Sequence, residues 1–515
     1  MALLPCLIPA FLAAVAYALP SQRWRPWTLP VAATLHLAAT VAAIGLSSGG
    51  TPAAAADSGP VDLVLGSGFG AGWLGLDPPG KIVLLTVSVL FFCCAWYAPG
   101  YLGLRQDRGN RMFVTALLLL LATMSLVTVS QHVGIMWVAM EASTLASGTL
   151  IYFNRTPQAI EATWKYLLIG SVGIALALLG TFFLGFSAIL GATAPSLLIG
   201  DLVRTATRHS PHWLDAAFVT LLVGYGTKMG LAPMHTWKPD AYGEAPGIVG
   251  ALLAGGLTSC SFLAILRIVK VMGAAGRGAF AADMLVGIGL FSMATGAVFM
   301  VRQRDYKRAL AYSSVEHMGI LALGIGLGGA GIFGAMLHLI NNALAKGVLF
   351  LSSGNIHRAY GSKSTEHVGG ALTRLPVSGA LFLAGFFAVT GSPPFGLFVS
   401  EFTIVRAAFT AQRYGVGGLI LVLLLAVFIG MGGTVLAVVQ GRDTSAAPEG
   451  GRAPFRDTAA TVLPAVILLA LVLLLGVYLP SPLRGLLDEA AAFLDPSHAL
   501  AALPGAAALP AEPHP

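Results

Sequence analysis

The sequence predicts an all-α protein that spans a membrane about fourteen times. Hydrophobic residues make up 56% of its 515 residues and charged residues only 10%, against roughly a quarter in an ordinary soluble domain. Apolar runs of about 20 residues, the length that a helix needs to cross a bilayer, recur along the whole chain. So little polar surface excludes a soluble fold of this size. The formal net charge of +7 therefore does not indicate nucleic-acid binding.

The apolar runs define the predicted helices, and two of these helices are broken. The run 376–410 is too long for one straight crossing, and Pro393 and Pro394 interrupt it in the middle. The seventh run breaks at Pro233, because proline lacks the amide hydrogen that continues a helix. The predicted spans are 2–20, 28–47, 82–99, 112–130, 133–152, 166–188, 214–232, 246–269, 283–301, 309–327, 331–356, 376–410, 415–440 and 459–480.

The two breaks suggest an internal duplication. Each comes four spans into a block of five helices, one block over 112–272 and the other over 281–440. An odd number of spans inverts the second copy, and inverted repeats with broken helices are a transporter architecture whose site lies at the break. Three helices over 1–111 precede the blocks, and a last helix and C-terminal tail over 441–515 follow them. The alternative is a pair of unrelated proline kinks, which membrane helices tolerate.

Cations in the loops predict the orientation. Arg23 and Arg25 follow the first span and no cation precedes it, which is the reverse of a secretory signal peptide. This order places the N-terminus outside, and alternation then gives the cytoplasmic loops about twice as many cations as the outer segments. Lys238 and Lys307 count among the cytoplasmic cations and Arg267 among the outer ones. We expect a multi-pass protein of the cytoplasmic (inner) membrane with both termini outside.

The sequence offers no ligands for a cofactor of its own. The four cysteines lie in apolar runs and form no C-x-x-C pair, which argues against an iron–sulfur cluster, a zinc site or a disulfide framework. Neither a phosphate-binding loop nor a dinucleotide fingerprint in a strand–helix context is present. We expect no metal and no cofactor in this chain, so that any redox chemistry belongs to a partner.

Two ionisable residues fall inside predicted spans. Glu141 lies in the middle of the fifth span, and Lys228 lies one turn before the break at Pro233. A charge at bilayer depth costs roughly 2.5–3.5 kcal/mol on insertion scales, so it usually has a partner and a function. A lysine whose protonation depends on a nearby carboxylate can serve as one step of a proton relay. The alternative is a static ion pair that joins two helices.

More ionisable residues extend this pair into a series. Glu401 follows the second break, and His338 and Lys346 fall on nearly one face of the eleventh span. A spaced series of acids and bases is harder to explain as helix contacts than a single pair. Lys165, next to Trp164, is explained equally well as an interfacial anchor. The candidate proton pathway is Glu141, Lys228, His235, His338, Lys346 and Glu401, with Lys165, Glu316 and His317 as further candidates.

Three motifs resemble one known family. Residues 228–241 read KMGLAPMHTWKPDA, residues 304–314 read RDYKRALAYSS, and residues 338–351 read HLINNALAKGVLFL. They are similar to the seventh helix, the loop into the tenth helix and the eleventh helix of the antiporter-like membrane subunits. That family includes subunits of respiratory complex I, Mrp-type antiporters and membrane-bound hydrogenases. EAP at 244–246, SSVEHMG at 313–319 and GSPPFGLFVSEF at 391–402 resemble the component F group of hydrogenase-4.

The resemblance implies roles and partners. Glu141 would be the glutamate that pairs with Lys228, the central lysine of the seventh helix. His338 and Lys346 would continue the polar axis towards Glu401, which would face the outer half-channel. Other membrane subunits and a cytoplasmic hydrogenase-like module with nickel–iron and iron–sulfur centres would be the partners.

The sequence also departs from the family pattern. Some pumping relatives carry a base in the eighth helix, where residues 257–260 here read LTSC. Asn342 replaces a second histidine of the eleventh helix, and Tyr242 stands where the hydrogenase-4 type leads us to expect histidine. Water held by Ser259 and Asn342 would bridge this gap. Alternatively, the gap weakens or stops conduction.

Three functions remain open from the sequence. The first is a proton-translocating subunit of a hydrogenase-4-like complex. The second is a transporter with the same fold, either a stand-alone or Mrp-type sodium/proton antiporter or an inorganic-carbon uptake subunit. The third is a structural membrane anchor that conducts nothing.

Overall fold

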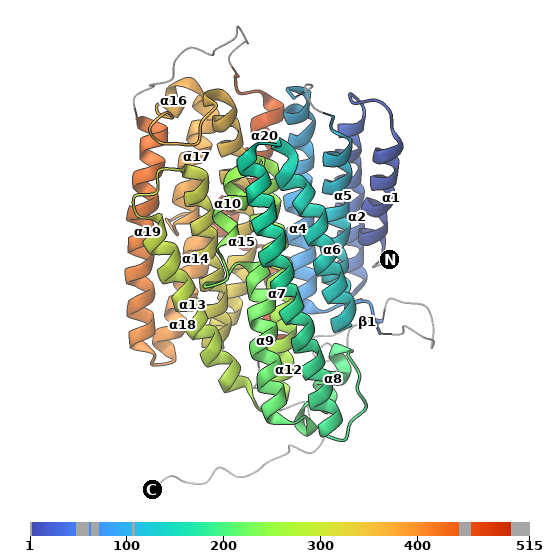
Figure 1. Cartoon of the computed structure of the whole chain (residues 1–515). Coiled ribbons are helices and arrows are strands. Elements are labelled where there is room, and N and C mark those ends of the chain that lie inside the picture. The colour runs from blue at the N-terminus through green and yellow to red at the C-terminus, as the bar shows by residue number, and fades with distance from the viewer. Residues whose placement is uncertain (1–2, 48–60, 63–71, 106–108, 442–454, 496–515) are drawn as a thin grey trace.

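The computed structural model describes residues 3–47, 61–62, 72–105, 109–441 and 455–495. Nearly all of these residues are helical, and the long helices run roughly side by side in one elongated bundle (Figure 1). Within these residues the only strands are β1 (Val61–Asp62) and β2 (Gly75–Leu76), which pair antiparallel. The predicted all-helical fold is confirmed.

The helices follow the predicted order. In chain order they are α1 (Leu4–Ala18), η1 (Arg25–Trp27), α2 (Thr28–Ser47), α4 (Pro78–Gly103), α5 (Arg111–Val129), α6 (Val133–Ile151), η2 (Tyr152–Asn154), α7 (Pro157–Leu190), α8 (Ile199–Thr205), η3 (Ala206–Arg208), α9 (Pro211–Met229), α10 (Trp237–Glu244), α11 (Gly247–Ala251), η4 (Leu252–Leu257), α12 (Thr258–Ala274), α13 (Gly278–Met300), α14 (Tyr306–Leu327), α15 (Ala330–Tyr360), α16 (Ala371–Arg374), α17 (Pro376–Val389), α18 (Gly396–Thr410), α19 (Tyr414–Gln440), α20 (Ala459–Val477) and α21 (Ser481–Leu494).

Eleven helices of the described chain are long and apolar enough to cross a membrane. Each corresponds to one predicted span, and α11, η4 and α12 together form one of them. The three remaining predicted spans correspond to α1, which has 15 residues, and to the broken helices α9–α10 and α17–α18.

Two helices that carry ionisable residues of the series, α14 and α15, are among the most deeply buried. Nearly all side chains of α14, α15 and the α11–α12 crossing are buried, whereas most of those on α2, α7, α19 and α20 are at least partly exposed. In Figure 1, α15 lies inside the bundle, while α1 and α19 lie at its two edges. An apolar exposed face suits lipid, so the ionisable series lies inside the protein.

Small residues bring two pairs of central helices into close contact. A Cβ on Gly224 of α9 would lie 2.7 Å from the carbonyl oxygen of Gly173 on α7, and one on Gly289 of α13 would lie 2.8 Å from that of Gly319 on α14. Glycine at such positions lets helix backbones approach closely, as in other membrane bundles. The polar residues on α9 and α14 are therefore held rigidly against their neighbours.

The three prolines expected to break helices, Pro233, Pro393 and Pro394, lie in gaps between helices. α9 ends at Met229 and α10 begins at Trp237, and α17 ends at Val389 and α18 begins at Gly396. A glycine with left-handed backbone follows the first half of each broken helix, Gly230 at φ +81° and Gly391 at φ +65°. Glycine adopts this conformation without the steric penalty that a Cβ imposes.

Several cations that were counted in loops are buried in helices instead, among them Lys81 on α4. Lys238 and Lys307 are 0% and 3% exposed and lie on α10 and α14, and Arg267 is 0% exposed on α12. Arg267 forms an ion pair with Asp77, with Nε 2.8 Å from Oδ2. Polar sequence around a proline looks like loop, but buried hydroxyls, carbonyls and a carboxylate satisfy these cations inside the bundle. Arg108, Arg442 and Arg452, also expected in cytoplasmic loops, lie outside the described residues.

Candidate functional site

Lys228 lies at the end of α9, where the first broken helix stops. Its side chain is fully buried. Nζ donates hydrogen bonds to Thr144 Oγ1 at 2.6 Å and to the Tyr166 hydroxyl at 3.0 Å. Tyr166 in turn lies 2.5 Å from Ser147 Oγ. The ammonium group therefore donates hydrogen bonds to neutral hydroxyls of α6 and α7. These hydroxyls carry no negative charge that would fix the lysine in its charged form.

Glu141 lies near Lys228 but does not bond to it. Glu141 is partly exposed, and its Oε1 accepts a hydrogen bond from Ser171 at 3.4 Å, while Oε2 is buried without a partner. Among the described residues no ion pair joins Glu141 to Lys228, although the two interact electrostatically. Thr144, one turn along α6 from Glu141, accepts a hydrogen bond from the ammonium group instead. The direct pairing implied by the family resemblance is thus absent from this conformation.

Lys238, which the sequence analysis placed in a loop, is the second buried lysine. It lies on α10, and its Nζ donates to Ser314 Oγ on α14 at 3.0 Å. The signal that could have found it is its position inside the break, since functional groups gather where a membrane helix unwinds.

Lys346 lies in the middle of α15 and is fully buried. Its Nζ donates to Ser313 Oγ on α14 at 2.7 Å, and it interacts electrostatically with Glu316. Both carboxylate oxygens of Glu316 are buried without a hydrogen-bond partner. Oε2 of Glu316 lies 3.5 Å from His317 Nε2, and the charge of Lys346 would stabilise this carboxylate in its ionised form.

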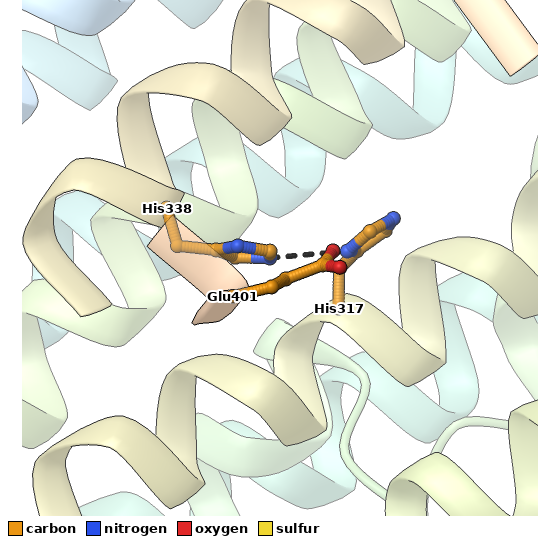
Figure 2. A group of neighbouring side chains, drawn as sticks. All are labelled: His317, His338 and Glu401. Carbon is orange, nitrogen blue, oxygen red and sulfur yellow. Dashed lines mark hydrogen bonds between the residues drawn. The ribbon is translucent and has the colours of Figure 1, made fainter. Parts of the chain in front are cut away.

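Two histidines connect this region to the second broken helix. His317 Nδ1 lies 3.0 Å from His338 Nε2, and His338 Nδ1 lies 3.0 Å from Ser400 Oγ. Figure 2 shows this His–His hydrogen bond, with the Glu401 carboxylate beside the His317 ring. Oε1 of Glu401 is buried without a partner. Directly bonded imidazoles can pass a proton, because each ring has one nitrogen that donates and one that accepts.

The same cluster has the composition of a metal site. One ligand atom each from His317, His338 and Glu401 lie within 4.8 Å of one another, and two imidazoles with a carboxylate suit Zn²⁺. Lys346 and Lys238 interact electrostatically with His317, however, and their positive charge opposes a divalent cation. Hydrogen bonds already join both histidines, so we interpret the cluster as a hydrogen-bonded relay.

The other candidate residues form no side-chain hydrogen bond, among the described residues, with Lys228, Lys346, His317, His338 or Glu401. His235 Nδ1 is buried without a partner, and so is Asn342 Oδ1. Ser259 donates to the Gly255 carbonyl of its own crossing at 2.6 Å. Lys165 is exposed and forms ion pairs with Glu161 and Asp240 at 2.7 and 2.8 Å, as an interfacial anchor would.

The π-helical turn η4 directly precedes the position where some relatives carry a base. It covers Leu252–Leu257 and lies next to Thr258 and Ser259. Such turns are rare and often occur at functional sites. Here both hydroxyls bond to backbone carbonyls of their own crossing, so this turn adds no ionisable group to the row.

Comparison with known protein families gives one broad match and several relatives. The profile of the NADH:quinone oxidoreductase/Mrp antiporter transmembrane family matches residues 130–430, which is more than half of the chain. A hydrogenase-4 component F homolog of Methylacidiphilum infernorum is 32% identical over 422 residues, covering 78% of this chain and 87% of that relative. Hydrogenase-4 component B of Escherichia coli is 27% identical over 77% of this chain and 61% of its own length.

A sodium/proton antiporter subunit also matches. Subunit A1 of Staphylococcus aureus is 29% identical over 66% of this chain, although the match spans only 43% of that larger relative. Relatives named for hydrogenases and relatives named for antiporters thus each align with about two thirds or more of this chain.

Solved structures share the fold over nearly the whole chain. A chain of the archaeal membrane-bound sulfane sulfur reductase superposes with a TM-score of 0.83 at 20% identity, covering 97% of this chain and 99% of that one. A chain of the Mrp complex from Dietzia superposes at 0.81 and 21% identity, covering 97% and 98%. A chain of respiratory complex I from Thermus thermophilus superposes at 0.79 and 22% identity, covering 96% and 99%. At these identities the likeness shows the fold alone.

Proposed function

Because the chain belongs to the NADH:quinone oxidoreductase/Mrp antiporter transmembrane family, we propose that it is a proton-translocating subunit of a hydrogenase-4-like energy-converting complex. The observation that carries this proposal is the buried row of ionisable side chains. It runs from Lys228 through Lys346, His317 and His338 to Glu401, and every member is at most 7% exposed. Burying so many ionisable groups is expensive for stability, so a function is the better explanation.

The geometry supports a stepwise mechanism. Protonated Lys228 donates hydrogen bonds to hydroxyl groups, and whether it keeps its proton depends on the charge of the nearby Glu141. When Glu141 is ionised and close, Lys228 keeps its proton, and when Glu141 is neutral or distant, Lys228 releases it. Released protons move towards Lys346 and then through the bonded pair His317 and His338 to Glu401. Redox events in a neighbouring subunit would set the charge or position of Glu141.

Two inverted five-helix repeats are part of the proposal. The block 112–272 would comprise α5, α6, α7, α9–α10 and α11–α12, and the block 281–440 would comprise α13, α14, α15, α17–α18 and α19. The fourth member of each block is broken and has a left-handed glycine after its first half. Residues 1–111 and 441–515 would add the flanking helices, for fourteen crossings in total.

Charges at the two ends of the bundle support the proposed orientation. Arg105 bonds to Asn154 at 2.6 Å, Asn154 to the Glu244 carbonyl at 2.9 Å, and Lys363 to the Glu244 carboxylate. These contacts gather the loops predicted to be cytoplasmic at one end, which holds α16, while α8 lies at the other (Figure 1). By the positive-inside rule the cation-rich end faces the cytoplasm of an inner membrane. Both termini would then lie outside.

The partners would be other membrane subunits and a cytoplasmic hydrogenase-like module. Relatives named for hydrogenase-4 support this assignment. Nickel–iron and iron–sulfur centres would belong to those partners, and this chain would supply the proton path. The first test is to purify the assembly through a tag on this chain and to measure its nickel and iron content. Nickel together with a hydrogenase-like large subunit is the expected result.

Two variants then test proton movement. Lys228→Ala and Glu141→Gln should lower hydrogen-driven proton translocation in membrane vesicles by roughly 10²-fold or more, as loss of a positioned proton-transfer group does. Assembly with the partners should persist. Arg413→Gln is the control, because Arg413 forms only an exposed ion pair with Asp283. Wild-type translocation in both relay variants would contradict the mechanism.

A sodium/proton antiporter is the second candidate, and the match to a sodium/proton antiporter subunit favours it. The same ion row would then exchange protons for sodium without a redox partner. Sodium-dependent proton flux in liposomes that contain this chain without redox subunits would support it. An inorganic-carbon uptake subunit would instead assemble with partners that hold neither nickel nor iron–sulfur centres. A non-conducting anchor would show no flux in either assay.

A further inference from the structure

Lys238 is a buried base that the proposed path does not yet use. Its side chain is fully buried, and its Nζ lies 3.0 Å from Ser314 Oγ. Ser313, the preceding residue on α14, accepts the hydrogen bond from Lys346 at 2.7 Å. The hydroxyls that hold the two lysines are therefore adjacent in sequence on one helix.

The surroundings of Lys238 link it to both sides of the row. It interacts electrostatically with Lys346 on α15, His317 on α14 and His235 in the break. Its Nζ lies 5.8 Å from the centre of the Tyr242 ring. Its printed hydrogen bonds go to Ser314 alone, and no Asp or Glu of the described residues forms an ion pair with it, so no carboxylate fixes its charge.

An aromatic row connects this position to Lys228. The Tyr166 hydroxyl accepts from Lys228 Nζ, and the Tyr166 ring packs against Trp237 with centroids 5.0 Å apart. Trp237 packs against Tyr242 at 5.8 Å, and the Tyr242 side chain is fully buried. Lys228 and Lys238 thus lie at the two ends of the row Tyr166, Trp237 and Tyr242.

The two broken helices share one local arrangement. A Cβ on Gly230 would overlap the Lys238 side chain, and a Cβ on Gly391 would overlap the Glu401 carboxylate. In each case the left-handed glycine that follows the first half leaves room for an ionisable side chain from the second half. Lys238 therefore has the same relation to the first break that Glu401 has to the second.

We propose that Lys238 is a proton-relay residue that links Lys228 to the histidine pair, in place of the base that the eighth helix lacks. This inference rests on the proposed function of the row. A proton arriving from the Lys228 side forms an N–H bond on Nζ, and an N–H bond breaks when a proton leaves towards His317. The side chain returns to its starting state, so the step needs no oxidant, reductant or co-substrate.

Lys307 is a buried lysine with a structural role, and its hydrogen-bond acceptors differ from those of Lys238. Lys307 is also buried, but its Nζ donates to the backbone carbonyls of Gly243 at 3.0 Å and Ala245 at 2.6 Å. These carbonyls end α10, where a fixed positive charge is stabilising. Lys307 interacts electrostatically with Lys363, Asp305 and Glu244, but its side-chain hydrogen bonds go to backbone carbonyls, so it provides a buried-lysine control from the same region.

The experiment compares three substitutions of Lys238 in the complete complex. Lys238→Met should lower proton translocation per assembled complex by roughly 10²-fold. Lys238→Arg should not restore it, because arginine keeps its charge at all physiological pH values. Lys238→His should restore part of it with an activity optimum at lower pH, because imidazole titrates near 6.5. Lys307→Met should reduce the amount of assembled complex but not translocation per complex.

Each outcome has a distinct meaning. Full translocation by Lys238→Met, or rescue by Lys238→Arg, would overturn the relay role and leave Lys238 as a structural contact to α14. Lys228→Ala, measured in the same vesicles, distinguishes failure of the inference about Lys238 from failure of the proposed function. If Lys228→Ala is inactive while Lys238→Met is active, only the inference about Lys238 fails. If Lys228→Ala is also active, the proposed function itself fails.

Discussion

Two left-handed glycines determine where two ionisable side chains can lie. Gly230 and Gly391 both have positive φ, and the space above each is filled by Lys238 or Glu401. Gly276 is a comparable left-handed glycine at φ +72°, but a Cβ there would meet nothing within 4 Å. Alanine at Gly276 would therefore cause backbone strain alone, whereas alanine at Gly230 or Gly391 would also displace an ionisable side chain.

We expect Gly230→Ala to lower proton translocation about as strongly as Lys238→Met, because the new methyl group displaces the lysine from Ser314. Gly276→Ala should cost only the backbone penalty of about 1–2 kcal/mol and leave translocation per complex unchanged. Both are measured by proton uptake in vesicles and by thermal unfolding in detergent. Equal translocation in the two variants would show that the Lys238 position does not matter for transport.

The sequence predicted most of the row but not its contacts. Lys228, Lys346 and Glu401 stand out because a charge inside an apolar run is conspicuous. The sequence predicts a loop at Lys238 because Pro239 disfavours a helix and Asp240 is charged. Which hydroxyl holds each lysine depends on helix packing, which no local pattern encodes.

A buried ion pair connects three helices at the end of the bundle opposite α16. Arg267 of α12 bonds to both oxygens of Asp77, the N-cap of α4, at 2.8 and 3.0 Å. It also donates to the carbonyls of Val127 and Thr128 in the last turn of α5. Together with the contact from Nη1 to Met136 Sδ at 3.7 Å, these bonds use the five N–H donors of a guanidinium that is fully buried.

Arg267→Met should therefore destabilise the protein by about 3–5 kcal/mol, because it leaves a buried carboxylate uncompensated. Arg267→Lys should not restore stability, since an ammonium group cannot reproduce the bidentate geometry. The measurement is thermal unfolding in detergent. Arg413→Gln serves as the comparison and should cost no more than about 1 kcal/mol, as exposed ion pairs do. A similar loss in both would contradict the assigned role of Arg267.

At the scale of helices, apolar length and proline were sufficient to predict nearly every element. The spans followed from runs of apolar residues, and Pro233, Pro393 and Pro394 marked the breaks. The π-helical turn over Leu252–Leu257 was not predictable, because a π turn and an α turn share one apolar pattern. The hydrogen bonds that define it depend on packing against neighbouring helices.

The proposed orientation of the whole molecule can be tested by cysteine labelling. All four native cysteines are buried, so background labelling is low. A cysteine replacing Glu366, at the cation-rich end, should be protected from a membrane-impermeant maleimide in right-side-out vesicles. A cysteine replacing Arg204, at the opposite end, should react. Both side chains are well exposed, at 55% and 76%. The reverse labelling pattern would invert the topology and place both termini inside.

Mutual repulsion between the buried bases limits how many protons the row can hold. Lys346 and Lys238 act electrostatically on each other and on His317, in surroundings where like charges are screened poorly. A second positive charge next to an occupied lysine is therefore disfavoured, and occupancy is anticooperative. In the proposed mechanism protons would therefore pass in single file, and each arrival would help to expel its predecessor. The number of protons moved per turnover would then reflect the number of passages, and adding further lysines to the row would not increase it.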